Sequence, residues 1–198
     1  MKEINTKLSE SQIREKFYSD TDESAKAEFI NGEVIIHLPS TKKQNQITGL
    51  LLKLLNIYCY KHNLGFVGFE KIMTVFSRND YEPDIVFFGN EKAKNFTQEQ
   101  TLFPTPDFVV EILSKSTAKN DRGVKFDDYE THQVQEYWII DPSNEVVEQY
   151  ILQEKRYELA LKSDNGTIKS RVIEGFEIPI RAIFDIKVNF ETLQKLLN

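Results

Sequence analysis

The order of the predicted elements indicates an α/β fold, with a mixed central sheet flanked by helices and antiparallel hairpins at its edges. Two observations lead to this prediction. Residues 41–63 have apolar residues at helical spacing and are followed by three short apolar runs typical of strands. Further along, residues 107–141 contain a strand, a helix and another strand, which we expect to add to the same sheet.

The composition favours one globular domain that spans residues 1–198. The chain has 40% hydrophobic and 28% charged residues, which is typical of a soluble domain with a substantial core. No apolar run approaches the roughly 20 residues of a membrane span, and the N-terminus lacks the apolar segment of a secretory signal. We therefore expect a cytoplasmic protein that does not enter a membrane.

The first part of the chain is expected to form a helix, a hairpin and a second helix. Ser9 and Gln12 have the spacing of a capping box. Asn31-Gly32 separates two apolar-rich runs and is a strong hairpin pattern. The expected elements are a helix at 9–18, strands at 26–30 and 33–38, and a helix at 41–63 with Gly65 near its C-cap.

The rest of the chain is expected to alternate strands with a few helices. One of these helices would place Asp121, Lys125 and Tyr129 on a single stripe. The expected elements are strands at 65–70, 72–76 and 82–88, a linker at 89–106 with at most one helical turn, a strand at 107–113, a helix at 120–132, strands at 136–141, 145–152, 156–161 and 168–173, and a short C-terminal helix.

Two acidic residues interrupt apolar strands: Asp84 in EPDIVFF and Glu111 in DFVVEIL. If the two strands are neighbours, these side chains can lie within about 5 Å of each other. Two carboxylates at this distance repel each other unless they share a proton, contact a basic side chain or bind a divalent metal. An all-oxygen site of this kind suits Mg²⁺ or Mn²⁺.

The histidines and the cysteine are not expected to take part in chemistry. His37, His62 and His132 lie on different predicted elements without ligand spacing, so each is interpreted as a surface or capping residue. Cys59 lies among apolar residues of a predicted helix, which indicates a buried thiol.

The net charge of −6 argues against a broad nucleic-acid surface, because phosphate binding depends on clustered Lys and Arg. Residues 114–125 nevertheless contain Lys115, Lys119, Arg122 and Lys125. This stretch could form a local basic rim beside a metal site, or it could be a solvated loop.

Several segments resemble a known family. Pro83-Asp84, followed by Glu111 on a later strand, resembles the PD-(D/E)xK phosphodiesterase pattern of restriction-endonuclease-like folds. More narrowly, AEFINGEVI, EPDIVFF, PDFVVEILSKST, DRGVKFDDYE, EYWIIDP and IEGFEIPIRAIF resemble, in this order, the blocks of the Uma-two family of predicted endonucleases, over roughly residues 25–186. The resemblance implies a restriction-endonuclease-like fold and a metal-dependent endonuclease that hydrolyses DNA phosphodiester bonds.

One residue departs from the superfamily pattern. A lysine usually stands two residues after the glutamate, and here that position is Leu113. The resembled family has the same apolar replacement and a lysine on the following helix, which implies that Lys125 is a relocated catalytic lysine. Lys125 would orient the attacking water or stabilise the transition state by its charge.

The resemblance also implies the remaining roles. Asp84, Glu111 and the backbone carbonyl of Ile112 would hold Mg²⁺ or Mn²⁺, which would polarise the scissile phosphate and acidify a water. Glu28 or Glu33 could complete the metal shell. The residues expected to contact the nucleic-acid backbone are Ser114, Lys115, Ser116, Thr117, Lys119 and Arg122.

Simpler interpretations of the same residues stay open at this point. Asp84 could cap a turn after Pro83. Glu111 could form a buried ion pair with Lys125 or Arg122 that only positions the helix. Lys125 could equally be a surface lysine paired with Asp121, four residues earlier.

A second functional class is therefore an inactive binding or interaction module with a nuclease fold. Leu113 and the acidic net charge favour this alternative. Cutting both strands of a duplex needs two sites, so a homodimer is compatible with the endonuclease hypothesis. The sequence does not identify an interface. The sequence does not distinguish DNA from RNA as the substrate.

Overall fold

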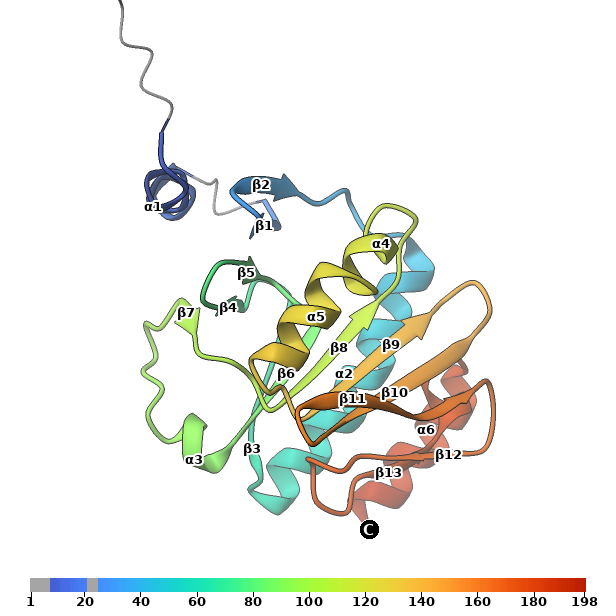
Figure 1. The fold of residues 1–198 in the computed structure, drawn as a ribbon. Coiled ribbons are helices and arrows are strands. Elements are labelled where there is room, and N and C mark those ends of the chain that lie inside the picture. The colour runs from blue at the N-terminus through green and yellow to red at the C-terminus, as the bar shows by residue number, and fades with distance from the viewer. Residues whose placement is uncertain (1–7, 21–24) are drawn as a thin grey trace, which may run out of the picture.

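The computed structural model describes residues 8–20 and 25–198, and Figure 1 shows how its elements are arranged. The helices are α1 (Glu10–Asp20), α2 (Lys42–His62), α3 (Asn90–Ala93), α4 (Ala118–Asp121), α5 (Val124–Thr131) and α6 (Ile186–Leu197), and a 3₁₀ helix covers Ile180–Ile183. The strands are β1 (Ala27–Ile30), β2 (Glu33–Ile36), β3 (Gly65–Phe69), β4 (Met73–Val75), β5 (Asp80–Tyr81), β6 (Ile85–Gly89), β7 (Leu102–Phe103), β8 (Phe108–Ile112), β9 (Glu136–Asp141), β10 (Val146–Gln153), β11 (Arg156–Ser163), β12 (Thr167–Lys169) and β13 (Glu177–Pro179).

Six strands form the central sheet in the order β11-β10-β9-β8-β6-β3. β8 and β9 run parallel, and the other neighbouring pairs are antiparallel. Parallel neighbours need a crossover connection, and α4 and α5 supply it. The predicted mixed sheet with flanking helices is confirmed.

Both faces of the central sheet are covered by helices. Successive residues of a strand point to opposite faces, so Phe108, Val110 and Ile112 pack into the core that contains α2 residues. Val109 packs into the second core, which contains Tyr129 of α5. Figure 1 shows α2 and α5 on opposite sides of β8. The same alternation directs Glu111 toward α5.

The predicted hairpin forms β1 and β2 and belongs to a second sheet with the order β2-β1-β5-β4-β7. Asn31 and Gly32 have φ angles of 51° and 84°, the left-handed values of a two-residue hairpin turn. Beyond the strands, the N–H of His37 donates to the carbonyl of Lys26 at 2.9 Å. Lys26, Glu28 and His37 therefore lie on the same face of the hairpin.

The first two helices begin as predicted. The Thr41 side chain accepts the N–H of Gln44 to form a capping box at the start of α2. Ser9 and Gln12 form the same motif before α1. The left-handed residue that ends α2 is Asn63, with φ of 52°, so Asn63 is the C-cap in place of Gly65.

The single helix expected at 120–132 is wrong, because the chain forms two helices, α4 and α5, with a turn between them. The turn includes Gly123, whose φ of −120° and ψ of −105° are not helical. A Cβ at this position would lie 2.8 Å from the carbonyl oxygen of Lys119. Glycine permits a turn that the spacing of apolar residues does not reveal.

Two further predicted segments are corrected. The strand expected at 168–173 is limited to β12, because the N–H groups of Arg171 and Val172 donate to the buried carboxylate of Glu136. The linker expected at 89–106 contains β7, which pairs with β4. Within the described ranges, none of the helices combines the length and apolar character needed to span a membrane.

Candidate active site

Asp84 and Glu111 lie opposite each other at one end of the β6–β8 pair. These strands pair with Ile85 opposite Val110, so the next position places Asp84 opposite Glu111. The N–H of Ile112 donates to Asp84 Oδ2 at 2.8 Å, which ties the start of β6 to the end of β8. The two acidic strands are therefore neighbours, which was the condition for placing these carboxylates close together.

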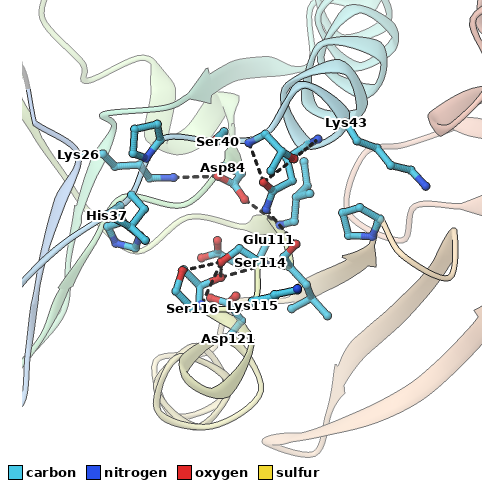
Figure 2. A pocket seen from close by; sticks show the side chains of 18 of the residues that line it. Lys26, His37, Ser40, Lys43, Asp84, Glu111, Ser114, Lys115, Ser116 and Asp121 are labelled. Atoms are coloured by element: carbon cyan, nitrogen blue, oxygen red, sulfur yellow. Dashed lines mark hydrogen bonds and ion pairs between the residues drawn. The ribbon is translucent and has the colours of Figure 1, made fainter.

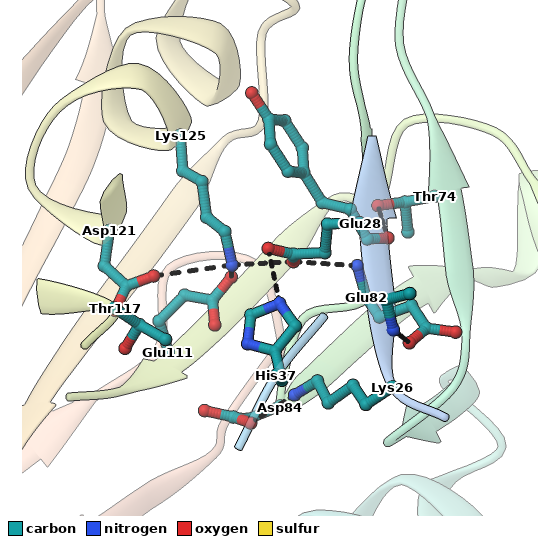
Figure 3. Close-up of polar contacts among 12 residues, drawn as sticks. Lys26, Glu28, His37, Thr74, Glu82, Asp84, Glu111, Thr117, Asp121 and Lys125 are labelled. Carbon is teal, nitrogen blue, oxygen red and sulfur yellow. Dashed lines mark hydrogen bonds and ion pairs between the residues drawn. The ribbon is translucent and has the colours of Figure 1, made fainter. Parts of the chain in front are cut away.

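The ammonium of Lys125 lies among three carboxylates (Figure 3). Its Nζ is 2.8 Å from Glu28 Oε1, 3.0 Å from Glu111 Oε1 and 3.4 Å from Asp121 Oδ1. The Lys125 side chain is only 2% exposed. Tyr129 also donates its hydroxyl to Glu111 Oε1 at 2.8 Å. Lys125 is therefore a buried counter-ion, and the interpretation of a surface lysine is wrong.

The pKa values of this cluster reflect its excess of acidic groups. Burial raises the pKa of Glu111 to about 8, and the neighbouring carboxylates add to this rise against the opposing effect of Lys125. Burial acts to raise the pKa of Glu28 as well, but Lys125 and His37 outweigh it and lower the pKa to about 2. Burial acts to lower the pKa of Lys125, and the carboxylates hold it well above its ordinary value. Glu28 and Lys125 are thus charged at neutral pH, whereas Glu111 readily holds a proton.

A pocket of about 490 Å³ opens beside Asp84 and Glu111 (Figure 2). The hairpin and the start of α2 line part of it, and the loop between β8 and α4 lines another part. At the loop, Ser114 Oγ lies 3.0 Å from Ser116 Oγ and 2.9 Å from Thr117 Oγ1, so the hydroxyls form a small network. The basic residues of the lining are Lys26, His37, Lys43, Lys115 and Lys125.

Lys26 and His37 are pocket residues that the sequence analysis missed. Lys26 Nζ lies 2.8 Å from Asp84 Oδ1, and His37 Nε2 lies 2.9 Å from Glu28 Oε2. His37 is therefore not an isolated surface or capping residue. The period-two alternation of the predicted hairpin places Lys26, Glu28 and His37 on one face, and this pattern could have found both residues.

Three predicted site residues lie elsewhere. Glu33 is exposed in β2, so Glu28 is the hairpin glutamate that reaches the cluster. Both terminal nitrogens of Arg122 are bonded to Glu148, at 2.6 and 3.0 Å. Lys119 is exposed, and neither Lys119 nor Arg122 belongs to the lining of the pocket. A side chain in a basic run can face any direction, and these two lie outside the lining of the pocket.

The mixed sheet and its paired acidic strand ends define the restriction-endonuclease-like class of α/β fold. Residues 14–181 match the model of the Uma2 family, which is described as "Putative restriction endonuclease". The chain belongs to the Uma2 family.

The chain is also similar to two further proteins. The chain is 31% identical over 137 residues to "Uncharacterized protein sll1609" of Synechocystis sp. (strain ATCC 27184 / PCC 6803 / Kazusa), a match that covers 67% of this chain and 77% of that protein. The crystal structure of "a putative nuclease belonging to DUF820" from Anabaena variabilis ATCC 29413 has a TM-score of 0.75 and 18% identity, and the match covers 90% of this chain and 98% of that one. The match to the Anabaena structure shows that the two proteins share a fold.

Proposed function

We propose that this protein is a metal-dependent endonuclease that hydrolyses DNA phosphodiester bonds. The observation that carries the proposal is the pairing of Asp84 with Glu111 at one end of the central sheet, beside a pocket rich in lysine. The description of the matching family and that of the Anabaena protein support the same class of activity.

The oxygen donors of the pocket suit Mg²⁺ or Mn²⁺. Asp84 and Glu111 supply carboxylates, and the carbonyl of Ile112 lies on the same side of its strand as the N–H that reaches Asp84. Among residues 8–20 and 25–198, no group of three or more His, Cys, Asp or Glu side chains is placed to hold a metal. Mg²⁺ commonly uses one or two carboxylates and keeps several waters, so these three donors are sufficient. When bound, the ion supplies Lewis-acid polarisation of the phosphate and a lowered pKa of water.

The protein's own residues would bind and orient the substrate. The net charge is −6, so attraction of a polyanion depends on the local lysines of the pocket, among them Lys43 and Lys115 at its rim. The hydroxyls of Ser114, Ser116 and Thr117 can donate to phosphate oxygens. Lys125 would hold Glu111 and Glu28 in place and contribute positive charge near the reacting phosphate.

An inactive binding module is the second candidate, and one observation favours it. Both carboxylates proposed to bind the metal already have a lysine partner: Asp84 has Lys26, and Glu111 has Lys125. These ion pairs would neutralise the carboxylates without a metal.

A plasmid-cleavage assay separates the two candidates. We expect the wild-type protein to nick or linearise plasmid with Mg²⁺ or Mn²⁺, and Asp84→Ala, Glu111→Ala or EDTA to abolish cleavage. Calorimetric titration with Mn²⁺ should show binding that depends on both carboxylates. Undiminished cleavage by either variant would contradict this site. A folded wild-type protein with neither cleavage nor carboxylate-dependent Mn²⁺ binding would support the inactive module.

A further inference from the structure

We infer that Lys26, from the start of the hairpin, is the lysine that contacts the scissile phosphate, and that Lys125 is a structural counter-ion. This inference rests on the proposed function and names the cationic residue of its site. It differs from the sequence-based expectation, which gave the catalytic role to Lys125.

The contacts of Lys125 argue against direct contact with a substrate. An ammonium has three N–H donors, and three carboxylates lie within 3.4 Å of Lys125 Nζ. The side chain is 2% exposed, and its ammonium lies 5.6 Å from the ring centroid of Tyr81. Movement of Lys125 toward a phosphate would leave buried carboxylates without their cation.

Lys26 is in the opposite situation. Its side chain is 27% exposed and lines the pocket, and among the described residues its ion pair is with Asp84 Oδ1 at 2.8 Å. Figure 2 shows its ammonium directed at Asp84 within the pocket. A charged group of this kind can keep its bond to Asp84 and still donate to a phosphate oxygen.

The hairpin fixes the position of Lys26. Its carbonyl accepts the N–H of His37 at 2.9 Å, and the next residue, Ala27, donates its N–H to the buried carboxylate of Glu82 at 3.0 Å. A backbone held on both sides keeps the side chain directed into the pocket, and such fixed positioning is what preorganised electrostatic stabilisation requires.

The chemical step balances without proton transfer by Lys26. The oxygen of a water forms a bond to phosphorus, and the bond from phosphorus to the leaving oxygen breaks. The water gives a proton to solvent, and the leaving oxygen takes one from solvent. Lys26 keeps its three protons and stabilises the negative charge on the non-bridging oxygens.

The test compares Lys26→Met with Lys92→Met. Lys92 is a matched control, because it pairs with Asp107 at 2.6 Å and its side chain is 36% exposed, but it does not line the pocket. We expect Lys26→Met to lower kcat by about 100-fold, with a thermal midpoint close to that of the wild type, and Lys92→Met to leave kcat unchanged. Full cleavage by a folded Lys26→Met variant would overturn the inference.

A second measurement restores the charge. In a Cys59→Ala background, which removes the native buried thiol, Lys26→Cys can be alkylated with 2-bromoethylamine to give an ammonium at nearly the lysine position. We expect alkylation to recover at least tenfold of the lost kcat. A folded, fully alkylated protein without recovery would count against direct contact.

A binding measurement works without turnover and without metal. Calorimetry with thymidine 3′,5′-bisphosphate in EDTA should give a Kd at least tenfold weaker for Lys26→Met than for the wild type and Lys92→Met. Equal Kd values for all three proteins would overturn the inference. If the wild type binds this nucleotide through Lys26 but does not cleave DNA, the proposed endonuclease function fails and the phosphate contact stands.

Discussion

Asp84 and Asp107 occupy equivalent positions at opposite ends of the β6–β8 pair. Asp84 precedes β6 and accepts the N–H of Ile112, the last residue of β8, at 2.8 Å. Asp107 precedes β8 and accepts the N–H of Gly89, the last residue of β6, also at 2.8 Å. Each aspartate has a lysine partner as well, but only the Asp84 end carries Glu111 and lines the pocket. The two aspartates have matching structural roles, but only Asp84 lies at the candidate site. Substitutions at the two positions can therefore separate effects on activity from effects on stability.

The first prediction uses this pair. Asp84→Asn should abolish Mn²⁺ binding and cleavage, because an amide removes the negative charge that a divalent ion requires. Its oxygen can still accept the N–H of Ile112, so the protein should stay folded. Asp107→Asn should change stability to a similar extent and leave cleavage intact. Calorimetry, plasmid nicking and thermal unfolding provide the measurements, and equal loss of cleavage in both variants would refute the assignment.

The second prediction concerns the buried counter-ion. Lys125→Met should lower the free energy of unfolding by about 3–5 kcal/mol, because it leaves buried carboxylates without a cation. Lys162→Met is the control, since Lys162 pairs with Glu148 from a side chain that is 60% exposed, and should change stability by less than about 1 kcal/mol. Urea denaturation measures both values. A Lys125→Met protein as stable as the control would contradict the role given to this lysine.

The third prediction is a pH dependence that arises from Glu111. Its pKa is raised from 4.5 to about 8, so the folded state binds this proton more tightly than the unfolded state does. The resulting stability is fully present below about pH 4.5 and is lost as the pH rises through about 8. Between about pH 5 and pH 8, the free energy of unfolding of the wild type should therefore fall by up to about 3 kcal/mol more than that of Glu111→Gln.

Urea denaturation of both proteins in EDTA at the two pH values tests this expectation. The test compares how the free energy of unfolding of each protein changes with pH. A difference in this free energy that is independent of pH is not informative, because glutamine also alters the contact with Lys125. A difference that is the same at both pH values would show that Glu111 has an ordinary pKa.

The fourth prediction concerns the turn between α4 and α5. Gly123→Ala should destabilise the protein by about 1–3 kcal/mol, because its Cβ would lie 2.8 Å from the Lys119 carbonyl oxygen. Gly49→Ala provides the contrast. A Cβ at Gly49, inside α2, meets nothing within 4 Å, so alanine there should stabilise the helix by up to about 1 kcal/mol. Thermal unfolding of the two variants should therefore shift in opposite directions.

Much of the fold could be predicted from local patterns. The Asn31-Gly32 turn, the capping box at Ser9 and Gln12 and the apolar strands are each determined by neighbouring residues. The sequence also indicated that Asp84 and Glu111 would lie close together if their strands were neighbours, and the order of the sheet meets this condition. These predictions needed no knowledge of distant contacts.

The remainder depends on contacts between distant segments. The alternation of the hairpin places Lys26 and His37 on the face of Glu28, but no local pattern specifies that this face packs against the end of the central sheet. Arg122 faces Glu148, a partner on β10 that lies 26 positions later in the sequence. A glycine between two helical segments is compatible with a continuous helix or a break, and tertiary packing decides between them.

The separation of Glu111 from Lys125 by 14 positions has a consequence for finding related proteins. A search that requires a lysine two positions after the glutamate would pass over this chain, since Leu113 stands there. A more suitable query combines an apolar strand that bears glutamate with a lysine on the following helix. It also requires a hairpin that places Lys, Glu and His on one face. Chains recovered in this way could then be sorted by whether the hairpin lysine varies together with the aspartate of the next acidic strand.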